Sequence, residues 1–211
     1  MNKIKLIQIA VILFTSASSM ERDSASKKLF LFIGLPGSGK TTVCQKLAQN
    51  HTSVVHQSVG DLLRAEAKKN SPRGESVNNL ISQGKLVPFE ITLDILDDFL
   101  LKNQKTIILL DGYQGTQEYI EPFHKLMNHH QIKLLKVFSL DVSIKIALER
   151  SQARMRSDDT PEALKNRLES RLRNINDIQA WYESKELLVH IDSENTLDKV
   201  ISQVEYIVLN S

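Results

Sequence analysis

Residues 28–42 read KLFLFIGLPGSGKTT, an apolar run followed by a glycine-rich segment. The apolar run at residues 29–33 has the length of a strand and no polar face, which is typical of a strand buried in a parallel sheet. Residues 34–41 match the phosphate-loop pattern G-x-x-x-x-G-K-[ST] and stand between a predicted strand and a predicted helix, as that pattern requires. Its four specified positions give on the order of one chance match per hundred chains of this length. We therefore predict a nucleotide-binding site directly after the first strand.

The glycines of this segment allow successive backbone N–H groups to point at one phosphate, and the dipole of the following helix adds to the attraction. Lys40 is expected to reach the β- and γ-phosphates of ATP, and the Thr41 hydroxyl to bind Mg²⁺. A glycine-rich turn that only packs a strand against a helix is the alternative, and we disfavour it. The residues expected to bind ATP in this segment are Gly37, Ser38, Gly39, Lys40, Thr41 and Thr42.

The rest of the chain alternates between strand and helix patterns. Further strands are expected at residues 54–57, 106–110, 134–140 and 187–191. Helices are expected at residues 41–49, 61–69, 74–82, 91–101, 142–155, 161–183 and 197–208, and Asp61 is the expected N-cap of the second. This alternation predicts an α/β fold of the P-loop three-layer sandwich type, a parallel sheet with helices on both faces.

The composition fits one soluble globular domain. Of 211 residues, 41% are hydrophobic and 25% charged, which excludes a disordered chain, a fibre and a polytopic membrane protein. Lysine and arginine number 27 against 25 aspartate and glutamate, so the net charge of +2 gives no indication of nucleic-acid binding. The single cysteine, Cys44, excludes an internal disulfide and a four-cysteine zinc site. We expect a monomer with no nucleic-acid partner and no stable membrane partner.

The first 19 residues stand apart from this domain. They carry Lys3 and Lys5, an apolar run at residues 6–14 and then small residues, which resembles a secretory signal peptide. A start at Met20 is the alternative, with near even weight. We place residues 1–19 outside the fold. Because ATP is an intracellular donor, a cytoplasmic site of action is expected, and export stays open.

Asp111 and a group of arginines complete the predicted chemistry. Asp111 follows the strand at residues 106–110, and ligands of parallel sheets bind beyond the carboxyl ends of the strands. It is therefore expected to hold Mg²⁺ with Thr41, directly or through water. Planar guanidinium groups neutralise and position phosphates. Six arginines lie close together in sequence: Arg150, Arg154, Arg156, Arg167, Arg171 and Arg173. We assign the first four to phosphates and expect Arg171 and Arg173 to lie on a solvated helix face beside glutamates.

Taken together, these motifs resemble the nucleoside monophosphate kinases, adenylate kinases most of all. Residues 58–64 (SVGDLLR) and 83–88 (QGKLVP) are similar to the segments that open and close that family's monophosphate-binding insertion. Residues 111–113 (DGY) match the start of its Asp-Gly-Phe/Tyr signature, and residues 154–159 resemble a lid. The resemblance implies a kinase domain at residues 27–211, with the insertion at residues 58–88 and a short lid at residues 150–159.

The resemblance implies phosphoryl transfer from ATP to a nucleoside monophosphate, with Mg²⁺ and without structural zinc. It assigns Arg150 and Arg154 to the ATP phosphates, Arg156 and Arg167 to both substrates, and Arg64 to the monophosphate. With Lys40 and Asp111, the first four arginines form the expected catalytic set, and Asn195 is expected near the adenine of ATP. The residues assigned to the monophosphate site are Val59, Arg64, Lys85, Leu86, Val87, Gly112, Gly115, Tyr119, Arg156 and Arg167.

Three acceptor-side positions depart from the family pattern. Gly115 stands where the family has an arginine for the acceptor phosphate, and Tyr119 and Val59 replace a glutamine and a threonine that contact the base. Arg73 is one side chain that could replace the missing guanidinium. AMP is the favoured acceptor, but Val59 and residues 87–92 also resemble UMP/CMP kinases. A non-catalytic ATP-binding protein that has lost acceptor binding is the alternative from another functional class, and an altered acceptor is a third.

Overall fold

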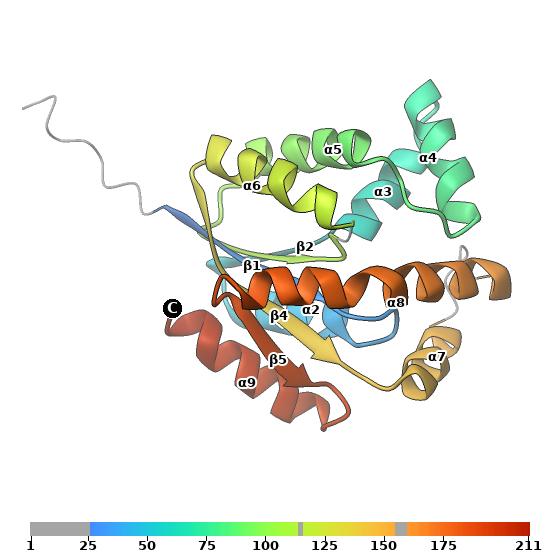
Figure 1. Cartoon of the computed structure of the whole chain (residues 1–211). Coiled ribbons are helices and arrows are strands. Elements are labelled where there is room, and N and C mark those ends of the chain that lie inside the picture. Colours follow the sequence, from blue (N-terminus) through green and yellow to red (C-terminus); the bar gives the residue numbers. More distant parts are fainter. Residues whose placement is uncertain (1–25, 114–115, 155–159) are drawn as a thin grey trace, which may run out of the picture.

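The computed structural model describes residues 26–113, 116–154 and 160–211 (Figure 1). Its sheet has the strand order β2-β3-β1-β4-β5, and every pair of neighbouring strands is parallel. The strands are β1 (Lys27–Ile33), β2 (Val54–Ser58), β3 (Ile107–Asp111), β4 (Ile132–Asp141) and β5 (Leu188–Asp192). The predicted α/β fold is confirmed.

Helices cover both faces of the sheet, because the strands are apolar on both sides. Successive side chains of β1 alternate between the faces: Phe30 and Phe32 pack with α2 and α9, whereas Leu29 and Leu31 pack with α5, α6 and α8. All four side chains are buried. The helices are α2 (Lys40–Asn50), α3 (Val59–Ala67), α4 (Pro72–Ser82), α5 (Phe89–Lys102), α6 (Ile120–His129), α7 (Ile144–Ala153), α8 (Pro161–Glu183) and α9 (Leu197–Leu209).

Two sequence expectations about the helices need correction. Asp61 lies in the first turn of α3 rather than at its N-cap, which is Ser58. Helix α6, with the short 3-10 helix η1 (Gln117–Tyr119) before it, was not predicted. Its buried residues Ile120, Phe123 and Met127 recur at helical spacing, and this was the signal in the sequence.

The carboxyl ends of three strands bring the functional segments together. In the register of the sheet, Phe32 of β1 and Ser58 of β2 both lie opposite Asp111 of β3. The loop after β1, the start of α3 and Asp111 therefore share one edge of the sheet. The long helix α8 crosses the molecule, with its N-terminal half beside the end of α4 and its C-terminal half over the sheet (Figure 1).

The two helices α3 and α4 form the segment between β2 and α5. Helix α4 begins after Ser71, whose Oγ accepts a hydrogen bond from Gly74 N at 3.0 Å, and α8 begins after Thr160 in the same manner. Both have proline in the first turn, where a missing N–H costs nothing. Within the three described ranges, no helix combines the length and hydrophobicity that crossing a membrane requires.

Candidate functional site

The loop between β1 and α2 has the backbone of an anion-binding turn. Gly34, Gly37 and Gly39 all adopt positive φ angles, of 139°, 83° and 90°. A Cβ on Gly37 would lie 2.1 Å from the carbonyl oxygen of Ala147, so α7 packs directly on this glycine. No side chain of the described residues caps the N-terminus of α2. The first N–H groups of α2 are thus accessible to a phosphate.

Lys40 lies folded onto this loop. Its Nζ donates hydrogen bonds to the carbonyl oxygens of Leu35 at 2.8 Å and Gly34 at 3.1 Å, and to Ser38 Oγ at 3.1 Å. Burial lowers the pKa of Lys40 to about 7, although the nearby Asp111 carboxylate opposes the change. A phosphate group would favour the charged ammonium, so this lysine is prepared to gain a proton when an anion binds.

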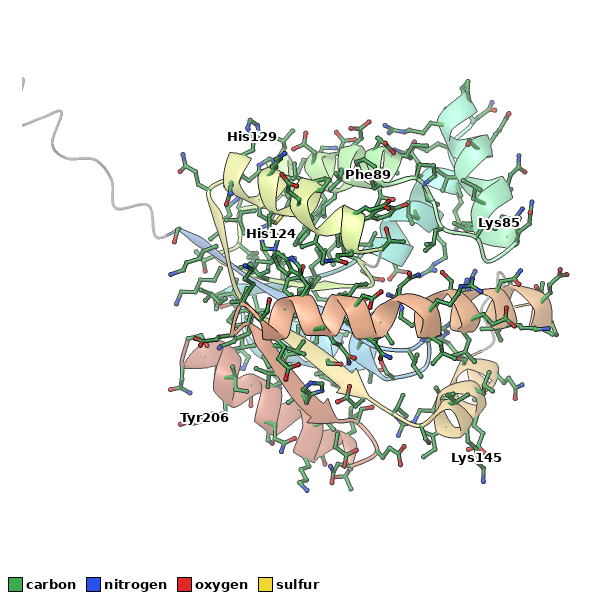
Figure 2. All side chains as sticks on the ribbon, in the orientation of Figure 1. Lys85, Phe89, His124, His129, Lys145 and Tyr206 are labelled. Carbon is green, nitrogen blue, oxygen red and sulfur yellow. The ribbon has the colours of Figure 1, made fainter. Side chains whose placement is uncertain are left out.

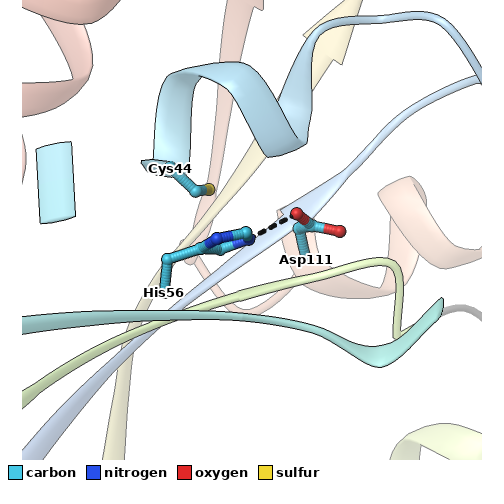
Figure 3. A group of neighbouring side chains, drawn as sticks. All are labelled: Cys44, His56 and Asp111. Atoms are coloured by element: carbon cyan, nitrogen blue, oxygen red, sulfur yellow. Dashed lines mark hydrogen bonds and ion pairs between the residues drawn. The ribbon is translucent and has the colours of Figure 1, made fainter. Parts of the chain in front are cut away.

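Asp111 is an ionised carboxylate held in a buried position at the end of β3. It is 2% exposed, and His56 Nε2 donates a hydrogen bond to its Oδ2 at 2.7 Å (Figure 3). Burial by itself raises the pKa of Asp111, but the hydrogen bond and charge of His56 and the charge of Lys40 outweigh burial, and the net pKa lies below its usual value. A charged oxygen ligand therefore faces the loop.

Cys44 is the third member of this buried group. Its Sγ, one ring nitrogen of His56 and one carboxylate oxygen of Asp111 all lie within 4.8 Å of one another. Burial raises the pKa of the Cys44 thiol well above its usual value, so the sulfur stays protonated and is a poor metal ligand. We interpret His56 as the residue that orients Asp111, a role that was not predicted from the sequence.

One cavity of about 800 Å³ joins the phosphate loop and Asp111 to the segments assigned to the monophosphate. It opens along the edge of the sheet between α2, α3 and α8, and Lys85 lies at the turn after α4 (Figure 2). The predicted site residues that line it are Gly37, Gly39, Lys40, Thr41, Thr42, Val59, Arg64, Lys85, Leu86, Val87, Asp111, Gly112, Tyr119, Arg150, Arg154 and Arg167.

The remaining predicted residues fall into two groups. Ser38 and Asn195 line a second cavity of about 250 Å³, which shares Gly39, Thr42 and Arg150 with the larger one. The shared residues make the small cavity an extension of the large one. Gly115 and Arg156 lie outside the described residues, as do residues 155–159 of the predicted lid.

Hydrogen bonds hold the arginines of the cavity to different elements. Arg150 Nη1 donates to the carbonyl oxygen of Ser193 at 3.0 Å, and Arg64 pairs with Asp61. Arg167 Nη2 donates to the carbonyl oxygen of Ile81 at 3.0 Å, which ties α8 to the end of α4. The guanidinium groups thus enter the cavity from α3, α7 and α8.

The expectation that Arg171 lies on a solvated helix face is wrong. Arg171 is 7% exposed and lines the large cavity, whereas Arg173 is exposed as expected. Residues four apart share a helix face, so Arg171 lies one turn after Arg167 on the cavity side of α8. The buried Ile175 and Ile178 continue the same face, and this stripe was the signal in the sequence.

The Adenylate kinase family model matches residues 32–187. An adenylate kinase of Nitratiruptor sp. is 40% identical over 186 residues, which cover 87% of this chain and 96% of that protein. The adenylate kinase of Helicobacter hepaticus is 38% identical over 85% of this chain and 96% of that protein. The adenylate kinase of Helicobacter pylori is 36% identical over 87% and 98%. On the strength of this match, which extends over the phosphate loop, Asp111 and all of α8, the chain belongs to the adenylate kinase family.

Proposed function

We propose that this protein transfers the γ-phosphoryl group of ATP to AMP and so forms two molecules of ADP. One observation carries the proposal: the phosphate loop, Asp111 and the segments assigned to the monophosphate line one continuous cavity. A cavity of about 800 Å³ lies within the range of natural ligand sites, and the smaller cavity beside Arg150 extends it. Two nucleotides could therefore meet phosphate to phosphate.

The donor side accounts for binding of ATP. The N–H groups of the loop and of the first turn of α2 bind the phosphates, and Lys40, Arg150 and Arg154 add positive charge. Asn195, which lines the smaller cavity, is assigned to the adenine.

The residues near the loop also fit Mg²⁺, which prefers oxygen ligands. The Thr41 hydroxyl and the ionised Asp111 carboxylate line the same cavity and supply such oxygens, and His56 fixes the carboxylate. When bound, Mg²⁺ neutralises charge on the donor phosphates.

The reaction needs no nucleophile from the protein. An oxygen of the AMP phosphate forms a bond to the γ-phosphorus, the bond from that phosphorus to the β–γ bridging oxygen breaks, and ADP leaves. The protein aligns the two phosphates and stabilises the charge that develops on the transferring group. Lys40 and the arginines at 150, 154, 156 and 167 are assigned this second role.

The related proteins favour AMP over the UMP/CMP alternative, since the relatives described above are named adenylate kinases. The same relationship favours an enzyme over a non-catalytic ATP-binding protein. We further propose that the protein acts as a monomer and in the cytoplasm, where its donor ATP is present.

A panel of acceptors tests this proposal. The protein is incubated with Mg²⁺-ATP and AMP, UMP, CMP or GMP, and ADP release is followed. We expect AMP to give the highest kcat/KM, and Lys40→Ala to lower turnover by at least ~10²-fold with an unchanged circular dichroism spectrum. Preference for UMP or CMP would favour that alternative, and ATP binding without turnover on any acceptor would favour the non-catalytic one.

A further inference from the structure

The guanidinium of Arg171 carries a buried charge that the described residues leave without an anion. The side chain is 7% exposed, and its Nε is buried without a hydrogen-bond partner. No hydrogen bond or ion pair links it to any other residue within the described ranges. Burial lowers the pKa of Arg171 to about 9, so the group is still charged at neutral pH. A charge in such a place is costly unless a ligand supplies the missing partner.

The position of Arg171 indicates which ligand that is. Helix α8 packs against η1, and Ile175, one turn after Arg171, belongs to the same apolar cluster as Tyr113. Arg171 and Tyr119 line the same cavity. The side chain therefore lies on the part of α8 that faces η1, and its charge is close enough to Lys40 to contribute to the lowered pKa of that lysine. Gly115, where the family pattern has an arginine, stands two residues before η1 in the sequence.

The acceptor side of the cavity has Arg64 and Arg167 but lacks one guanidinium group that the family pattern has. Arg73, a candidate replacement on sequence grounds, is bound through its Nε to Glu66 Oε1 at 2.7 Å and is not among the residues that line the cavity. The donor side already has Lys40, Arg150 and Arg154 along the cavity. Three described cations are thus assigned to the donor, whereas the acceptor has Arg64 and shares Arg167.

We propose that Arg171 binds the phosphate of the acceptor nucleotide and replaces the guanidinium that this family has at the position of Gly115. The assignment rests on the proposed function, because it requires a nucleoside monophosphate as acceptor. Arg167 and Arg171 then present two guanidinium groups from one face of a rigid helix. Because the contact is to phosphate, it contributes equally to binding of AMP and UMP.

Calorimetric titration of single substrates tests this assignment. AMP, UMP and ATP are titrated separately into the full chain and into Arg171→Met, Arg171→Lys and Arg173→Met. The last variant is the matched control, an exposed arginine two residues further along α8. We expect Arg171→Met to weaken AMP and UMP binding by roughly 10- to 150-fold, the range for charge-assisted hydrogen bonds, and to leave ATP binding unchanged. Arg171→Lys should lose less, and Arg173→Met should bind all three as before.

A second substitution tests the replacement itself. Adding Gly115→Arg to Arg171→Met should restore AMP affinity, because the guanidinium then returns at the family position. Thermal unfolding separates a binding role from a structural one. Removing an unpaired buried charge should raise the Tm of the free Arg171→Met protein by about 2–4 °C or more, whereas removing a structural arginine would lower it.

Each contrary outcome has a distinct meaning. Weakened ATP binding with normal AMP binding would make Arg171 a donor-side residue. The assignment would be overturned if Arg171→Met left the binding of all nucleotides unchanged or lowered the Tm. It would also be overturned if Gly115→Arg failed to restore AMP binding. If the unsubstituted protein binds AMP but does not turn it over, the proposed function fails and the titrations still decide the role of Arg171. If it binds neither AMP nor UMP, both proposals fail.

Discussion

Lys40 is expected to couple ATP binding to proton uptake. Burial lowers the pKa of Lys40 to about 7 in the free protein. At pH 8 a group with this pKa is about one-tenth protonated, whereas beside the phosphates of ATP it holds its proton, because an adjacent anion favours the charged form. Binding of one ATP should therefore take up about 0.9 proton at pH 8.

The same difference in pKa sets how affinity depends on pH. Above pH 7, each pH unit costs about 1.4 kcal/mol of binding free energy, so the Kd for ATP should rise about tenfold from pH 8 to pH 9. The stability of the free protein responds with the opposite sign. In the unfolded chain this lysine has its ordinary pKa of 10.5, so between pH 7 and 10.5 the unfolded state binds more protons and this group favours folding as pH rises.

Isothermal titration of ATP in two buffers with different ionisation enthalpies measures the proton uptake directly. At pH 8 the phosphates of ATP are already ionised, because their last pKa is near 6, so the proton that is taken up belongs to the protein. Lys40→Met is the control, since it keeps much of the side-chain volume and removes the ammonium. Absence of uptake at pH 8, or equal uptake by Lys40→Met, would refute the reasoning.

Three further predictions concern the loop, the metal-facing carboxylate and the N-terminus. Gly37→Ala should abolish ATP binding and lower Tm, because its Cβ would lie 2.1 Å from the carbonyl oxygen of Ala147; thermal unfolding with and without ATP checks this. His56→Leu should raise the Mg²⁺ concentration for half-maximal activity by about 10- to 100-fold, since Asp111 loses the donor that orients it, while the KM for AMP stays unchanged. A chain that begins at Met20 should have the Tm and ATP affinity of the full chain, because the first core strand starts at Lys27; circular dichroism and calorimetry test this boundary.

The elements of the sheet could be predicted because local sequence determines them. A continuous apolar run specifies β1, and Thr160 with Pro161 marks the start of α8, which begins at Pro161 both in the prediction and in the structure. Helix α6 was missed although Ile120 and Phe123 have helical spacing, because Pro122 interrupts the pattern. Proline is tolerated there, since it lies in the first turn.

The environment of single side chains could not be predicted in the same way. A charged residue such as Arg171 is exposed by default, and its burial depends on a cavity that α8 forms mostly with segments more than fifty residues away. His56 reads as an ordinary polar residue of β2, and its partner Asp111 lies 55 residues further along the chain on the neighbouring strand. Both residues acquire their chemistry from the register of the sheet and from helix packing.

The residues that line the cavity carry an excess of positive charge. Among the described residues that line it, seven are basic and two, Asp61 and Asp111, are acidic. In the free protein this excess is unfavourable, and the lowered pKa values of Lys40 and Arg171 reflect its burial. Phosphates of two nucleotides supply the missing negative charge, so part of the cost of assembling the site is recovered when both substrates bind. A site of this kind should gain more thermal stability from ATP and AMP added together than an uncharged cavity of equal size would gain from ligands of equal volume.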